Sequence, residues 1–209
     1  MGKTKKIIVS VILLMLIAVS VISVSGCTKK ISEEEAIAKV SELVLASYDI
    51  NVVVYGEGLP TIEIEEEKNS LYATVAENEK FNSTEDIKKE IERLYSSNIA
   101  SAMIATALEG VHGEVSGTIV YARYIDGRYG LSMLKDDIAL KGEVDVGGEK
   151  EEFEHEHMTV LRYNPETIEI TKISRRFVEA NITSQDGSVV TPVVLILENG
   201  EWKLDSPTY

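Results

Sequence analysis

Hydrophobic positions in the front part of the chain recur at the spacing of amphipathic helices. Ser32 is followed three residues later by Glu35, which is the pattern of a capping box at a helix start. Apolar side chains then recur at helical intervals, at Ile37, Val40, Val44 and Tyr48. Residues 50–55 form a separate apolar, β-branched run that ends at Gly56. The pattern therefore predicts one amphipathic helix from about residue 33, followed by this run.

Two further helices are predicted before the pattern changes. Asn82-Ser83-Thr84 suits a second helix start, and apolar residues follow it on one face, at Ile87, Ile91, Leu94 and Tyr95. Residues 97–109 are almost uncharged and precede Gly110, which predicts a third helix that is buried on most sides. Between the first two helices, residues 61–65 and 70–76 alternate as strands do.

The back half of the chain has the pattern of strands joined by tight turns. Strands are expected at residues 115–125, 128–134, 138–146, 153–162, 167–173 and 177–184. Asp126-Gly127, Asp186-Gly187 and Asn199-Gly200 are each typical of a hairpin turn. Helices first and strands later predict an α+β fold, in which the N-terminal helices pack on a curved antiparallel sheet.

The apolar stretch at the N-terminus has the features of a secretory signal. Three lysines precede it, small residues follow it, and it ends at Cys27, the chain's one cysteine. The sequence Val24-Ser25-Gly26-Cys27 resembles a bacterial lipoprotein signal, which implies cleavage before Cys27 and lipid attachment to its thiol. An uncleaved membrane anchor is the alternative, and it places the domain on the same side of the membrane. The expected organisation is a signal peptide at 1–26, a tether at 27–31 and one domain at 32–209.

The charge of the chain limits its partners. The net charge of the 209 residues is −14, and removing residues 1–26 with their three lysines makes it −17. Such a surface repels nucleic acid and favours basic partners, although many secreted proteins are acidic merely to stay soluble. We therefore expect no nucleic acid partner.

Catalytic motifs are missing from the sequence, and one cluster suits a metal. The chain has no phosphate-binding loop, nucleophile elbow or His-Glu-x-x-His motif, and we expect neither enzyme activity nor a cofactor. On a strand, His155 and His157 would share one face and could hold zinc or nickel with a third ligand. The alternative is a solvated edge strand whose charges discourage pairing with another chain.

Residues 123–129 are the main candidate for partner binding. This segment places Arg123, Tyr124, Asp126, Arg128 and Tyr129 around a predicted hairpin tip in an acidic chain. Arginine and tyrosine dominate binding hot spots, but the same residues could serve cross-strand packing.

The ending of the chain carries a family resemblance. Glu198-Asn199-Gly200-Glu201-Trp202-Lys203-Leu204-Asp205 is similar to the last hairpin of NTF2-like and cystatin-like extracytoplasmic domains. Trp202 on this strand is expected to anchor the core, with carbohydrate stacking as the alternative.

A narrower resemblance covers most of residues 32–207. The segments Ile31–Ala36, Phe81–Lys89 and Leu94-Tyr95, with the Trp-Lys-Leu ending, together resemble the DL-endopeptidase inhibitor (IseA-like) family. That resemblance implies a non-catalytic protein of Gram-positive bacteria that binds the catalytic domain of a cell-wall hydrolase and restrains autolysis. A ligand-binding module for a small molecule or wall fragment is the second possibility, and an enzyme that uses His155 and His157 is the third.

Overall fold

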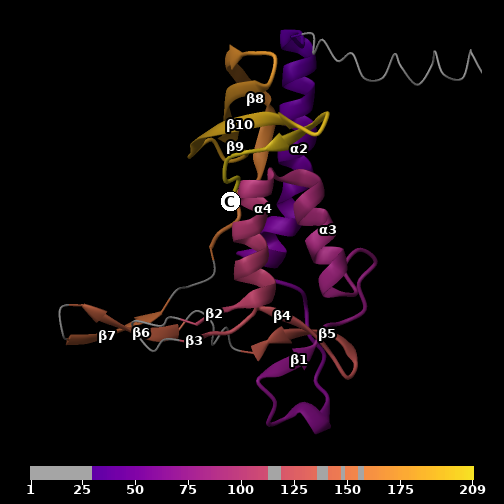
Figure 1. The fold of residues 1–209 in the computed structure, drawn as a ribbon, viewed down its shortest axis with the longest axis vertical. Coiled ribbons are helices and arrows are strands. Elements are labelled where there is room, and N and C mark those ends of the chain that lie inside the picture. The colour runs from indigo at the N-terminus through magenta and orange to yellow at the C-terminus, as the bar shows by residue number, and fades with distance from the viewer. Residues whose placement is uncertain (1–29, 113–118, 136–140, 147–148, 155–157) are drawn as a thin grey trace, which may run out of the picture. The chain divides into compact units, whose positions relative to one another are not determined.

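The structure is a computed structural model that describes residues 30–112, 119–135, 141–146, 149–154 and 158–209. Residues Ile31–Tyr209 form one compact unit. For residues 111–112, 119–120, 141–146 and 149–154, the description covers the backbone alone. Helices from the front of this unit and antiparallel sheets from its back confirm the predicted α+β class (Figure 1).

The longest described helix is α2, Glu33–Val54, which begins where the sequence predicts. The Ser32 side chain accepts a hydrogen bond from the Glu35 amide, and the Glu35 carboxylate accepts one from the Ser32 amide, which completes the capping box. The β-branched run at residues 50–54 is the last part of this helix rather than a separate segment. Ile50, Val53 and Val54 are buried there, so tertiary packing outweighs their modest helix propensity.

Two shorter helices follow the predicted boundaries closely. α3 spans Thr84–Leu94 and is capped by Ser83, and α4 spans Ser97–Ile104 and is capped by Ser96. A π-helical turn, η2 (Ala105–Glu109), continues α4 and ends at Gly110, whose φ of 67° is in the left-handed region that glycine favours.

The main sheet comes from the last quarter of the chain. It contains β8 (Tyr163–Ile173), β9 (Phe177–Ser184), β10 (Val190–Glu198) and β11 (Glu201–Leu204), in the order β11-β10-β9-β8 with antiparallel neighbours throughout. α2 lies against β8 and β11 (Figure 1). Alternate residues of the strands are buried toward the core, among them Val178, Ala180, Ile182, Val193 and Leu195.

The remaining described strands form smaller antiparallel sheets. β1 (Tyr72–Thr74), β5 (Gly130–Leu134) and β4 (Tyr124–Gly127) form one sheet in the order β1-β5-β4. β2 (Val111–His112) pairs with β3 (Ile119–Val120), and β6 (Lys141–Val146) pairs with β7 (Glu149–Glu154).

Several predicted strands are shorter than expected or lie elsewhere. The predicted strand at 61–65 is reduced to a bridge between Thr61 and Val75, and Glu65–Glu67 forms a 3₁₀ turn, η1. The strand predicted at 153–162 corresponds to β7, which begins four residues earlier and ends at Glu154. Among the described residues, no helix is both long and apolar enough to cross a membrane.

Candidate functional site

Two of the predicted contact residues, Arg123 and Tyr124, are buried at the C-terminal end of α2, with exposures of 7% and 0%. The Arg123 guanidinium donates hydrogen bonds to the carbonyl oxygens of Val54 and Gly56. The Tyr124 hydroxyl donates to the Val53 carbonyl at 2.9 Å and accepts from the Leu59 amide at 3.1 Å. The last carbonyls of a helix have no hydrogen-bond donors within the helix, and these two side chains supply the missing donors. Arg123 and Tyr124 therefore join β4 to α2.

The hairpin turn lies two residues later than the sequence predicts. Gly127 pairs with Gly130, so Arg128 and Tyr129 form the turn and Asp126-Gly127 belongs to β4. The Asp126 carboxylate accepts hydrogen bonds from the Thr84 amide at 3.2 Å and the Thr84 hydroxyl at 2.7 Å, which explains why Asp126 is held in the strand.

The tip of this hairpin is exposed. The Arg128 guanidinium lies 5.2 Å from the centroid of the Tyr129 ring, and 43% of Tyr129 is accessible to solvent. Of the five predicted contact residues, Arg128 and Tyr129 thus remain available to a partner. Asp126 is exposed as well, but its carboxylate is engaged with Thr84.

The lipidation and metal candidates lie outside the described residues. Cys27 precedes the described part of the chain, and His155 and His157 fall in one of its gaps. Among the residues that the structure does describe, no group of three His, Cys, Asp or Glu side chains could hold a metal ion. The predictions for these three residues therefore stay predictions.

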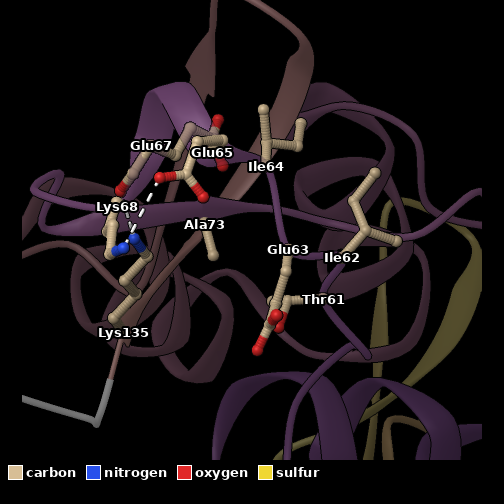
Figure 2. Close-up of a pocket in the computed structure, with 9 residues that line it drawn as sticks. All are labelled: Thr61, Ile62, Glu63, Ile64, Glu65, Glu67, Lys68, Ala73 and Lys135. Atoms are coloured by element: carbon tan, nitrogen blue, oxygen red, sulfur yellow. Dashed lines mark hydrogen bonds and ion pairs between the residues drawn. The ribbon is translucent and has the colours of Figure 1, made fainter.

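A pocket of about 640 Å³ opens between residues 61–68 and the β1-β5-β4 sheet (Figure 2). Its lining residues are Thr61, Ile62, Glu63, Ile64, Glu65, Glu67, Lys68, Ala73 and Lys135. Figure 2 shows the Lys68 and Lys135 side chains together at one end, beside Glu65 and Glu67, while Ile62 and Glu63 lie at the other end.

Four charged groups of this pocket, those of Glu65, Glu67, Lys68 and Lys135, are held by each other, by Thr74 or by the backbone. The Glu67 carboxylate accepts hydrogen bonds from the Thr74 hydroxyl at 2.6 Å and the Thr74 amide at 2.9 Å. These bonds stabilise the anion and lower the pKa of Glu67. Lys68 is 3.4 Å from the Glu65 carboxylate, and the Lys135 ammonium donates to the Glu67 carbonyl oxygen.

Neither Glu65 nor Glu67 is placed as an activated base in this pocket. A reacting site needs a nucleophile or base within hydrogen-bond reach of a group that activates it. The Glu67 carboxylate is bound by Thr74 and the Glu65 carboxylate is paired with Lys68, and the pocket lining contains neither histidine nor cysteine.

A second candidate site lies on the exposed side of α2 and contains an aromatic ring. The Arg162 guanidinium lies 3.9 Å from the Tyr48 ring centroid, and two shallow hollows of about 300 and 290 Å³ flank Tyr48. Cation–π stacking covers one face of this ring and holds the chain before β8 against the helix. Trp202, by contrast, is partly buried and packs against the core, as expected for an anchor.

Sequence reasoning missed both of these surfaces. Residues 61–65 were expected to be a strand, and the clue to the turn that follows was the unbroken run Glu65-Glu66-Glu67, which suits a turn better than a strand. No local signal connects Tyr48 with Arg162, because they are more than one hundred positions apart in the chain.

Comparisons of the chain with protein-family models and with curated proteins find no match.

Proposed function

We propose that this chain is a lipid-anchored extracytoplasmic protein that binds and inhibits a peptidoglycan DL-endopeptidase. In this proposal Cys27 carries the lipid, the folded unit from residue 31 carries the binding surface, and the protein performs no catalysis itself. The partner class comes from the resemblance to the IseA-like family, and the net charge of −14 supports a basic partner.

The filled core of the described unit is the observation that favours a protein partner over a small ligand. A ligand-binding module would need an enclosed cavity that buries most of its ligand. Between α2 and the main sheet, the interior is occupied by side chains with relative exposures of 0–5%, including Val40, Val44, Ile182 and Leu195. The hollows described above lie open at the surface. A surface with open hollows and a filled core suits a protein contact better than it suits a buried ligand.

An inhibition assay tests the proposal directly. The fragment from residue 28 to 209 contains the whole compact unit and lacks the signal. It is mixed with purified DL-endopeptidase catalytic domains from the same organism, and the lysis of isolated cell walls is followed by turbidity. We expect lysis to slow in proportion to the fragment until the two are equimolar, as for a stoichiometric inhibitor.

The salt dependence of this inhibition provides a second measurement. Electrostatic attraction between an acidic inhibitor and a basic enzyme speeds association, and salt screens it. The association rate should therefore fall as salt rises, while the dissociation rate changes little. Unchanged lysis at a several-fold excess of the fragment, for every DL-endopeptidase of the organism, would reject the proposal in favour of a ligand-binding module.

A further inference from the structure

Strand β10 is apolar on both faces, although one of its faces is open to solvent. Val193 and Leu195 point into the core and are 1% and 0% exposed. The alternate positions on the other side of the strand are also apolar: Val190, Pro192, Val194 and Ile196. Strands that are apolar on both faces are usually covered on both faces. Here Val190 and Pro192 are exposed and Val194 and Ile196 are half-buried, and an apolar row that is not covered indicates an interaction site.

The strands beside β10 extend this open face. Register places Phe177, Glu179, Asn181 and Thr183 of β9 directly opposite the row of β10. Glu169 and Lys172 of β8 continue the face beyond β9, since they pair with Asn181 and Glu179. We call these ten residues the open face. None of its apolar members belongs to the core cluster or packs against it, and 63% of Val190 is exposed.

A hollow of about 360 Å³ lies at one end of the open face. It forms where β8 departs from regular pairing, between Asn164 and Glu169. Glu166 and Glu169 of β8, Asn181 and Thr183 of β9, and Val190 of β10 are among the residues that line it. Breaks in regular strand pairing, such as β-bulges, commonly re-aim side chains next to functional sites.

The two ends of the open face differ in charge, because, among the described residues, the charged groups are paired at one end and unpaired at the other. At one end, the Lys172 ammonium is 3.4 Å from the Glu179 carboxylate and 4.6 Å from the Phe177 ring centroid, so this cation is already occupied. At the other end, the carboxylates of Glu166 and Glu169 form no ion pair within the described part of the chain. The hollow is therefore a site of net negative charge next to an apolar row.

We propose that the open face is the surface on which the hydrolase catalytic domain docks, with a lysine or arginine of the hydrolase entering the hollow between Glu166 and Glu169. The proposal rests on the function proposed above and assigns it to a surface other than the exposed hairpin tip. Apolar contact along β10 holds the complex, and the two carboxylates orient a basic partner.

A second copy of this chain fits the open face less well. Two-fold packing of the face on itself would bring the hollows and their unpaired carboxylates toward a second strongly acidic surface. Like charges that meet across an interface oppose association, whereas a basic partner neutralises them. Charge complementarity thus selects a basic protein as the occupant.

Paired substitutions test the proposal with the fragment 28–209 and the catalytic domain that it inhibits. Val190→Asp places a charge in the apolar row, and Glu169→Lys reverses a charge at the hollow. Each has a matched control on an exposed residue away from the open face: Leu71→Asp, at a side chain that is 46% exposed, and Glu77→Lys. Circular dichroism and thermal unfolding establish that all four variants remain folded.

We expect the dissociation constant for Val190→Asp to rise at least about tenfold, mostly through faster dissociation. For Glu169→Lys, we expect slower association and a weaker dependence of the association rate on salt. Both control variants should bind within about twofold of the wild type, because single surface changes outside an interface have little effect.

Three outcomes overturn the proposal, and they can be told apart. In the first, Val190→Asp and Glu169→Lys bind the hydrolase as the wild type does, and Tyr129→Ala abolishes binding. This result would move the contact to the hairpin tip and keep the proposed function. A wild-type fragment that binds none of the hydrolases would reject the proposed function and the docking surface together. Sedimentation that shows a dimer, converted to a monomer by Val190→Asp, would identify a second copy as the occupant.

Discussion

Replacing Tyr95 with phenylalanine should destabilise the domain, because the Tyr95 hydroxyl completes a closed network of buried polar groups. The hydroxyl donates to the Asn51 Oδ1 atom at 2.7 Å and lies 2.8 Å from the Thr208 hydroxyl. The Asn51 amide nitrogen in turn donates to the Thr208 hydroxyl at 3.0 Å and to the Thr208 carbonyl at 3.1 Å. The network fastens the end of the chain to α2 and to the residue that follows α3.

The size of the effect follows from what the substitution leaves behind. Asn51 is 0% exposed and Tyr95 is 1% exposed, so water does not replace the missing donor. A buried acceptor without a partner costs about 1–3 kcal/mol of unfolding free energy. For a domain of this size, about 1 kcal/mol lowers the melting temperature by about 2–4 °C. We therefore expect Tyr95→Phe to melt about 2–12 °C below the wild type.

Thermal and urea unfolding of the 28–209 fragment measure this effect, with Tyr129→Phe as the control at an exposed tyrosine. Thr208→Val and the double variant complete a double-mutant cycle. Because the two hydroxyls share a network, the loss in the double variant should be smaller than the sum of the single losses. A loss below about 0.5 kcal/mol for Tyr95→Phe, or strict additivity in the cycle, would refute the argument.

Further predictions concern acid stability, the end of α2 and the anchor. The Glu90 carboxylate accepts hydrogen bonds from Arg93 at 2.7 and 3.0 Å and forms an ion pair with Lys80 at 2.9 Å. These contacts stabilise the anion and lower the pKa of Glu90 to about 2. This depressed pKa contributes stability that is present above the ordinary pKa of about 4.5 and is lost as the pH falls toward 2. Glu90→Gln should therefore cost about 1–2 kcal/mol at neutral pH and almost nothing at pH 2, as urea titrations at several pH values will measure. Arg123→Met should cost about 2–4 kcal/mol in the same titration, because it leaves buried carbonyls at the end of α2 without donors, and a loss under 1 kcal/mol would contradict this role. Cys27→Ala should abolish incorporation of labelled fatty acid, and labelling at wild-type levels would reject the lipoprotein signal.

Local rules predicted the parts of the fold in which a few neighbouring residues decide the conformation. The capping box at Ser32 formed as expected, and the Asn199-Gly200 turn has the positive φ angles, 53° and 88°, that its hairpin type requires. In both places the hydrogen bonds and backbone angles depend on residues that are adjacent in the sequence.

Local rules were wrong where distant residues compete for the same segment. The β-branched run that begins at residue 50 was predicted to be separate from the first helix, but burial against the rest of the core keeps residues 50–54 in α2. Asp126-Gly127 has the composition of a turn, but Thr84, more than forty positions earlier, holds the Asp126 side chain and the turn moves to Arg128 and Tyr129. For Arg123 and Tyr124 the sequence left both partner binding and cross-strand packing open, since nothing near them in the sequence indicates the end of α2.

The candidate surfaces were still less predictable than the fold. The apolar character of β10 was visible in the sequence Val190-Thr-Pro-Val-Val-Leu-Ile-Leu197, which is apolar at nearly every position. The sequence alone could not tell which face the helices cover, because that depends on the register of β10 with β9 and on the side to which α2 packs. The hollow could not be predicted at all, since it depends on irregular pairing of β8.

The length of the predicted tether restricts where an anchored inhibitor could act. Residues 27–31 span at most about 18 Å when fully extended. A lipid on Cys27 would therefore hold the start of α2 within that distance of the membrane surface. Glu33, Glu34 and Glu35 lie in the first turn of α2, where they favour the helix and would be repelled by anionic headgroups. The domain would then stand off the bilayer with its tether extended, free to meet hydrolases that work next to the membrane and unable to follow those released into the outer wall.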